Sequence, residues 1–323
     1  MSLYTFSIFI KLILYVKMID FSNANINRSL KKISISSMLD TLFVSFDTFG
    51  VATNTFNKHF NNPNSEYYQM SVEQIMEAWQ EKGRQSTHYG SLLDDYIGSI
   101  LTGTDTDIKL FKLDNGYDYD DRLHGLCDSF DNFYSILSKS GDTEFIDREK
   151  YLYLKVQDPD TGEDMYLYGR FDALFRNKRT GKYILIDWKS SGTIDKVADR
   201  WTKKMLGPMF KYPQLNWFRY TLQLYFYKQA LLEGGYVPEG TSPDDIIVMI
   251  VNLPGKIIPE CNQNYQTHTG AMPYNTDELN KFYNFAIRKI NLSCIKKEAE
   301  KKETNENKDN NKQDNNDNLE NIF

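Results

Sequence analysis

Two aspartates interrupt apolar segments of the chain, and they restrict the folds that the sequence can adopt. Asp172 lies between Phe171 and Ala173, and Asp187 ends the apolar run of residues 183–186. Burying a lone carboxylate costs several kcal/mol unless it is paired or binds a cation. We therefore expect the fold to bring these acids to each other, to a basic side chain or to a metal ion.

The segments around both aspartates have the pattern of three antiparallel strands. Residues 149–157, 165–176 and 183–189 have strand patterns. Gly162 and Gly181 lie in the two short polar segments between them and supply the turns. The sequence thus predicts an antiparallel meander.

This meander places both acids and a lysine at one end of a sheet. Asp172 falls in the second predicted strand and Asp187 near the end of the third, so adjacent strands set the carboxylates side by side. Lys189 follows Asp187 by two residues and points to the same face. Bound Mg²⁺ or Mn²⁺ would remove the repulsion between the acids. The spacing indicates phosphodiester hydrolysis, with Lys189 orienting or deprotonating the attacking water; the alternative is a structural Asp–Lys salt bridge.

The remaining segments are mainly helical. Residues 33–46 change from strand to helix, with Ser36 or Ser37 as the cap, and Ser71 with Gln74 forms a capping box. Helical patterns cover residues 71–83 (ended by Gly83), 90–101, 121–139, 216–235 and 275–297, residues 104–120 have the pattern of a loop, and residues 245–253 form a buried strand. This order predicts an α/β fold of the α+β type, with a central mixed sheet flanked by helices and a helical N-terminal part.

One domain is expected from residue 24 to residue 296, with two different ends. Residues 1–23 are an apolar extension broken by Lys11, too short for a membrane span; either Met18 is the natural start or this segment is a helix that packs on the domain. Residues 297–323 are nearly free of apolar side chains, which predicts a disordered polar tail. Its acidic tip, which ends in Ile-Phe, is either a docking peptide for a replication or recombination protein or a solubilising tail.

The charges are unevenly distributed. The chain has a formal net charge of −6, yet residues 176–211 contain ten cations and three acids. Such a basic block is either a solvated face or a path for a phosphate-chain substrate. Trp201, Trp217 and Phe218 lie within or beside this block and either stack bases or pack in the core. The best candidates for phosphate contacts, which carry no sequence specificity, are Arg170, Lys182, Lys196, Arg200, Lys203 and Lys204.

The three cysteines are far apart and odd in number, so neither a disulfide framework nor a zinc site is indicated. This usage fits a reducing compartment such as the cytoplasm. Three cysteines are also too few for a four-cysteine iron–sulfur cluster, and we expect none.

Three motifs now appear in order: "GRFDALF", "YILIDWKSS" and, on the following helix, "YTLQLYFYKQALLE". Together they resemble the PD-(D/E)XK nuclease superfamily, in the RecB-like branch that includes the mitochondrial genome maintenance exonuclease and phage and viral relatives. The resemblance covers roughly residues 33–255 and implies a restriction-endonuclease-like core. It implies an active site formed by Asp172, Asp187, Lys189, Gln223 and Tyr227, with a metal contact from the main-chain carbonyl of Trp188.

The upstream motif departs from the family pattern. Many RecB-like nucleases carry G-T-x-x-H, whose histidine binds metal, whereas this chain has "GSLLDD" with Asp94 at the histidine position. A carboxylate can replace imidazole as a ligand of a hard metal. His88 is out of register. Glu149, at the start of the first predicted strand, is interpreted as an ordinary surface glutamate rather than as a further acid of the site.

The sequence therefore predicts a Mg²⁺- or Mn²⁺-dependent exonuclease acting on single-stranded or duplex DNA ends in replication, recombination or repair. It is expected to be phage- or virus-encoded, to act in the host cytoplasm and to have no membrane partner. The alternatives are a structure-specific endonuclease acting on flaps, junctions or RNA, and a nucleic-acid-binding scaffold that retains the fold with weak catalysis.

Overall fold

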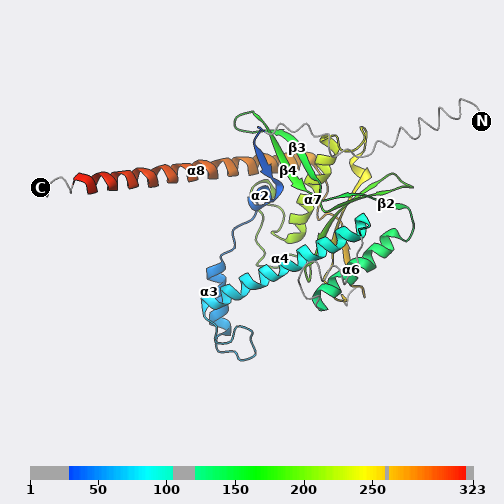
Figure 1. Cartoon of the computed structure of the whole chain (residues 1–323), viewed down its shortest axis with the longest axis horizontal. Helices are drawn as coiled ribbons and strands as arrows, with labels where there is room; N and C mark the ends of the chain where they lie inside the picture. Colours follow the sequence, from blue (N-terminus) through cyan, green and yellow to red (C-terminus); the bar gives the residue numbers. More distant parts are fainter. Residues whose placement is uncertain (1–28, 105–120, 259–261, 318–323) are drawn as a thin grey trace, which may run out of the picture.

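The computed structural model describes residues 29–104, 121–258 and 262–317, which form an α+β fold (Figure 1). The helices are α2 (Ile35–Asp40), α3 (Thr48–His59), α4 (Val72–Thr102), α6 (Asp121–Ser138), α7 (Asn216–Glu233) and α8 (Thr276–Asp317), with short 3₁₀ turns η1 (Gly207–Met209) and η2 (Pro243–Asp245). The strands are β1 (Lys32–Ser34), β2 (Thr143–Arg148), β3 (Tyr151–Gln157), β4 (Asp164–Arg170), β5 (Ala173–Asn177), β6 (Tyr183–Lys189), β7 (Ile246–Asn252) and β8 (Gln266–His268).

The strands form two sheets rather than one. A three-stranded sheet has the order β1-β4-β3, and a five-stranded sheet has the order β2-β5-β6-β7-β8. Strand β1 is parallel to β4, and β6 is parallel to β7, while the other pairs are antiparallel. Each sheet therefore combines one parallel pair with antiparallel pairs. Both sheets are thus mixed, in agreement with the α+β class that the sequence predicts.

The predicted meander is wrong at its second strand. The segment 165–176 is divided into β4 and β5, which belong to different sheets, and Phe171 with Asp172 lies between them. The Tyr227 hydroxyl donates to the carbonyl of Arg170 at 2.7 Å, so the last carbonyl of β4 bonds to a helix instead of a strand. This break places Asp172 before β5 and not within a strand.

The five-stranded sheet separates two hydrophobic cores. On one face, Leu185 and Ile250 pack in a core shared with α2, α7 and the three-stranded sheet. On the other face, Ile186, Trp188 and Phe130 pack in a core shared with α4 and α6. Because side chains alternate along β6, residues 187 and 189 follow Leu185 onto the α7 face.

Helix α4 replaces two predicted helices. The capping box of Ser71 and Gln74 forms as expected, but the helix continues through Gly83 to Thr102 and ends at Gly103 in the left-handed conformation (φ 70°). Glycine inside a helix costs only about 1 kcal/mol relative to alanine, so Gly83 was a weak stop signal. Figure 1 shows α3 beside the N-terminal end of this long helix and α6 beside its C-terminal half.

Several local predictions are confirmed and others need correction. Helix α7 ends at Gly234, and Asn275 caps α8 by accepting the N–H of Glu278 at 3.0 Å. The cap of α2 is Ser34, whose hydroxyl accepts the N–H of Ser37, and not Ser36 or Ser37.

The polar tail also differs from expectation. Helix α8 continues to Asp317 and extends away from the body of the molecule, whereas residues 297–323 were predicted to be disordered (Figure 1). The segment contains neither glycine nor proline, so no residue in it interrupts the backbone hydrogen bonds of the helix. The tip of the tail beyond residue 317, the loop predicted at 105–120 and the expectations for residues 1–23 and Met18 lie outside the described residues.

Within the described ranges, no helix combines the length and apolar character that a membrane span requires.

The continuity of α4 predicts opposite effects for two glycine substitutions. Gly83 is exposed and a Cβ there would meet nothing within 4 Å, so Gly83→Ala should raise the free energy of unfolding by about 0.5–1 kcal/mol. Gly103→Ala should lower it by about 1–2 kcal/mol, because alanine is strained at a positive φ. Denaturant unfolding of both variants measures the difference; a loss of stability for Gly83→Ala would mean that the helix is broken there.

Candidate active site

The register of β5 and β6 brings the two predicted aspartates together. Ala173 pairs with Ile186, so Asp172 and Asp187 occupy the next positions across the two strands. The Asp172 carboxylate accepts the main-chain N–H of Trp188 at 2.8 Å. This bond fixes Asp172 against β6 even though it lies outside the strand ladder.

Asp187 is buried with very little compensation. Its exposed fraction is 1%, and the Lys189 Nζ lies 2.6 Å from its Oδ2. Apart from this ion pair, neither carboxylate oxygen has a hydrogen-bond partner in the described part of the chain. Burial raises the pKa of Asp187, and Lys189 opposes that effect. Such a carboxylate retains the capacity to bind a further cation.

Lys189 is held as a cation. Burial by itself lowers the pKa of this lysine, but Asp187 and Asp172 outweigh burial and raise the pKa above its ordinary value. The ammonium also lies 4.6 Å from the centre of the Tyr220 ring, which stabilises the charged form. The lysine is therefore suited to opposing negative charge.

The pKa of Asp172 is raised as well. Burial, followed by repulsion from Asp187, raises the pKa of Asp172 to about 7, against the lowering effects of Lys189 and the N–H of Trp188. Both carboxylates ionise easily only if another positive charge joins them. In the described residues no group of three His, Cys, Asp or Glu side chains is arranged to hold a metal alone. A cation here would need main-chain or water oxygens in addition.

Asp94 reaches the site but is already paired. The Arg148 Nη2 lies 2.7 Å from its Oδ1. Burial raises the pKa of Asp94 to about 6 against the opposing Arg148 charge, with Glu149 and Asp172 adding to the rise. The Arg148 guanidinium occupies the space above Gly98, where a Cβ would fall 1.5 Å from Nη1. The residue at the histidine position of the motif is thus bound by an internal cation.

Glu149 is also part of the site, contrary to its interpretation as a surface residue. It has a left-handed backbone (φ 52°), which is unusual for a residue other than glycine. Its carboxylate lies 3.1 Å from Arg170 Nη2 and 3.6 Å from Arg148 Nη2. Recognition of β2 in the sequence would have shown that a two-residue connection, 149–150, places this acid at the strand ends.

These groups surround a cavity of about 240 Å³ at the end of the five-stranded sheet. Helix α4 forms one wall, and the ends of β4 and β6 form the others. Its lining residues are Gly90, Leu93, Asp94, Ile97, Glu149, Arg170, Asp172, Trp188, Lys189 and Ser190.

Gln223 and Tyr227 support the site from α7. The Gln223 Nε2 donates to the Tyr227 hydroxyl at 3.0 Å, and this hydroxyl donates to the Arg170 carbonyl at 2.7 Å. Burial raises the pKa of Tyr227 well above its ordinary value, so the phenol remains a donor. Gly169 allows the approach, because a Cβ there would lie 2.7 Å from Tyr227 Cε1. Both residues hold the β4–β5 junction and thereby position Asp172.

The predicted phosphate contacts divide into two groups. Arg170 lines the cavity, and Lys196, Arg200, Lys203 and Lys204 are exposed on the connection between β6 and α7. Lys182 is wrongly placed by the prediction, because it precedes β6 at the end opposite Lys189 and donates to the Asp244 carbonyl at 3.2 Å.

The predicted stacking residues also differ among themselves. Trp201 is exposed, whereas Phe218 packs in the core. Trp217 is partly buried and donates through Nε1 to the Thr269 carbonyl at 3.0 Å.

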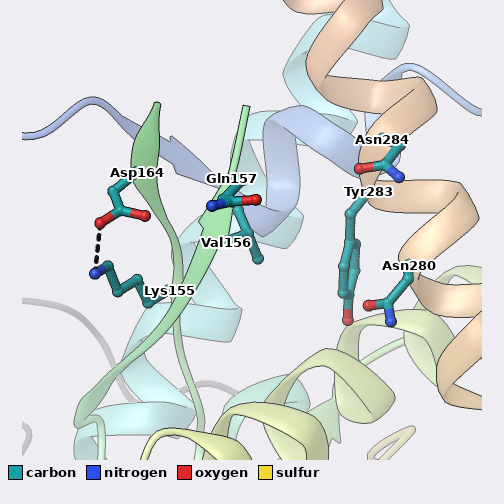
Figure 2. A pocket seen from close by; sticks show the side chains of 7 residues that line it. All are labelled: Lys155, Val156, Gln157, Asp164, Asn280, Tyr283 and Asn284. Carbon is teal, nitrogen blue, oxygen red and sulfur yellow. Dashed lines mark ion pairs between the residues drawn. The ribbon is translucent and has the colours of Figure 1, made fainter. Parts of the chain in front are cut away.

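A larger cavity of about 460 Å³ lies away from the acids, between β3, β4 and α8 (Figure 2). Figure 2 shows Asn280, Tyr283 and Asn284 on the helix facing the strands, with Lys155 and Asp164 paired on the strand side. The Tyr283 hydroxyl donates to Gln229 at 3.0 Å. Lys155, Asp164 and Tyr283 thus have partners, and we assign no chemistry to this cavity.

Comparison with known proteins adds little. No protein-family model and no curated protein matches the chain. One solved structure, described as "Crystal structure of SSO0001", aligns over 89% of this chain and 86% of that chain, with 11% identity and a TM-score of 0.30. A score of this size does not define a shared fold, so function must be inferred from the site itself.

The paired acids predict an inverted pH dependence of stability. The pKa of Asp172 in the folded protein is about 7, above its ordinary value of 3.8, so the folded state binds the proton more tightly. Its contribution is therefore complete below about pH 4 and is lost as the pH rises towards 7. We expect the Tm of Asp172→Asn in EDTA, relative to that of the wild type, to rise over this range, because the variant lacks the contribution that the wild type loses.

The matched control is Asp195→Asn, which removes a charge from an exposed aspartate that does not line the cavity. This variant should keep the wild-type slope. If Asp172→Asn leaves the slope unchanged as well, Asp172 does not hold the proton.

Proposed function

We propose that this chain is a metal-dependent nuclease that hydrolyses DNA phosphodiester bonds, with a restriction-endonuclease-like core of the PD-(D/E)XK class. The observation that carries the proposal is Asp187, a buried carboxylate that among the described residues is paired with Lys189 alone, next to Asp172, whose pKa is raised to about 7. An acid pair of this kind is costly unless it serves a cation. The absence of a sequence-reading motif favours an exonuclease of replication, recombination or repair.

The donor atoms fit a hard metal ion. Asp172, Asp187 and the main-chain carbonyl of Trp188 offer oxygen ligands, which Mg²⁺ and Mn²⁺ prefer, and the cavity beside them has room for water. When bound, such an ion polarises a phosphoryl oxygen and lowers the pKa of a coordinated water. Asp94, which occupies the motif position of the family's metal-binding histidine, could become a third ligand only after its ion pair with Arg148 breaks.

The chain's own cations have distinct roles in this proposal. Because its pKa is raised, Lys189 is charged at neutral pH and would stabilise negative charge on the phosphate or orient the attacking water, rather than remove a proton. Arg170, at the cavity wall, would contact a neighbouring phosphate once it separates from Glu149. Gln223 and Tyr227 act as positioning residues through the Arg170 carbonyl.

The occupied state of Asp94 favours the second candidate, a nucleic-acid-binding scaffold with weak catalysis. With only two acids available, such a protein would bind metal poorly and cleave slowly. The exonuclease, the endonuclease and the scaffold are separated by the assay that follows.

Lys189→Ala should abolish most of the cleavage. The wild-type protein is incubated with end-labelled single- and double-stranded DNA and with closed circular DNA, in Mg²⁺, Mn²⁺ or EDTA. We expect metal-dependent release of nucleotides from ends and a loss of about 100-fold or more in the variant, because a preorganised charge is removed. Lys182→Ala, at the opposite end of β6, is the control and should cleave like the wild type.

Two results would contradict parts of this proposal. No cleavage of any substrate would remove the nuclease and leave the scaffold, and cleavage that persists in EDTA would remove the metal dependence. Cleavage of closed circles would remove the purely exonucleolytic mode.

Tyr227→Phe should affect catalysis through position alone. Loss of the hydroxyl frees the Arg170 carbonyl and should lower the free energy of unfolding by about 1 kcal/mol, together with the cleavage rate of the folded protein. Tyr236→Phe removes a comparable hydroxyl, which accepts the N–H of Tyr153 at 3.2 Å, and should lower stability only. Equal cleavage rates in the two folded variants would show that Tyr227 is purely structural.

A further inference from the structure

A second surface feature lies at the N-terminal end of α7. It is a groove of about 280 Å³ between the chain segment before α3 and the basic connection from β6 to α7. Gln214 links the walls, since its amide accepts the Val44 N–H and donates to the Val44 carbonyl, both at 3.2 Å. We call it the Trp201 groove; its lining residues are Val44, Ser45, Phe46, Asp199, Trp201, Thr202, Lys203, Gln214 and Leu215.

Two aromatic side chains of the groove are left open to solvent. Trp201 is 75% exposed and Phe46 is 67% exposed. Trp201 is presented on a fixed turn, because the Asp199 carboxylate accepts its N–H at 3.0 Å and the Thr202 hydroxyl at 2.6 Å. Flat aromatic surfaces held in this way favour a ligand that has flat rings of its own.

The charges around the groove favour an anionic ligand. The Arg200 guanidinium lies 4.8 Å from the centre of the Trp201 ring, and Lys203 lines the groove. The acid of the groove, Asp199, is occupied by the turn. The N-terminus of α7 has no side-chain cap within the described residues, so its positive end also faces this region. A chain of phosphates that carries unstacked rings satisfies both the aromatic and the basic groups.

The groove leads to the candidate active site along α7. Lys196 lies 5.5 Å from the ring centre of Trp217, and Lys189 lies 4.6 Å from that of Tyr220, one turn further on. Residues three apart share a helix face. From Leu215 in the groove to Tyr220 the helix rises only about 7 Å. A strand bound in the groove would need to extend only this far along α7 to approach Lys189.

We propose that the Trp201 groove binds single-stranded DNA, with Trp201 and Phe46 stacking on its bases and Arg200 and Lys203 contacting its phosphates. The bases of a duplex are already stacked on each other, so they cannot use these rings. DNA is favoured over RNA because two of the three hydroxyl and amide side chains of the groove, Thr202 and Gln214, are engaged within the protein, which leaves Ser45 to read a 2′-hydroxyl. The direction of the strand towards Lys189 rests on the proposed function, whereas binding in the groove does not.

Fluorescence anisotropy of a labelled oligodeoxythymidine tests the groove in the full chain. The measurement is made in EDTA, so that no cleavage occurs. Trp201→Ala should weaken binding about tenfold or more, and Trp201→Phe should retain most of the affinity, because it keeps a stacking ring. Phe210→Ala removes an aromatic ring that is 69% exposed but lies outside the groove, and it should bind like the wild type. Circular dichroism checks that the variants are folded.

The outcomes separate the groove from the nuclease. Three results would each overturn the groove assignment. They are equal affinities of Trp201→Ala and wild type for the oligonucleotide, a loss of affinity in Trp201→Ala that is as large for blunt duplex as for the oligonucleotide, and tighter binding of oligouridine than of oligodeoxythymidine. A dimer in sedimentation that Trp201→Ala dissociates would show a second copy in the groove and also overturn it. If binding depends on Trp201 but the protein does not cleave DNA in Mg²⁺ or Mn²⁺, the groove assignment is supported and the nuclease proposal is contradicted. If the protein cleaves DNA but Trp201→Ala changes neither binding nor cleavage, the nuclease proposal is supported and the groove assignment is contradicted.

Discussion

The ion pair between Asp187 and Lys189 is the interaction on which the rest of the site depends. Both groups lie at the end of a central strand, where the alternation of β6 turns them towards α7. Placing an acid there is unfavourable, and one lysine only partly offsets the cost. Three features lie around the pair. The second acid, Asp172, has a raised pKa and can be protonated, the Tyr220 ring makes a cation–π contact with Lys189, and the cavity admits solvent.

Local signals in the sequence predicted the elements that local forces determine. The ends of α7, the capping box of α4 and the buried strand β7 follow from glycine stops, caps and apolar periodicity. The break between β4 and β5 was missed, because the deciding partner, Tyr227, lies on a distant helix. Strand β2 was missed because its sequence, TEFIDR, mixes acids with apolar residues and shows little alternation.

The candidate site was predicted in its centre and missed at its edge. Asp172, Asp187 and Lys189 meet as the strand pattern required, since register follows from pairing of adjacent strands. Arg148 was not predicted and Glu149 was interpreted as a surface glutamate, because their roles depend on contacts with residues far along the chain, such as Asp94 and Arg170. Sequence patterns predict residues whose positions follow from one element or from adjacent strands. They do not predict residues that reach the site only when three distant elements pack together.

Arg148, whose guanidinium lies above Gly98, also contributes to the net charge of the cavity. Four carboxyl groups, those of Asp94, Glu149, Asp172 and Asp187, lie in or beneath it, against three cations, Lys189, Arg148 and Arg170. With one proton on Asp172 the unliganded site is neutral. A divalent ion that displaced this proton would leave one positive charge, which a single phosphodiester would neutralise. The cavity would thus have no net charge without ligands, and again none with a divalent ion and one phosphodiester bound.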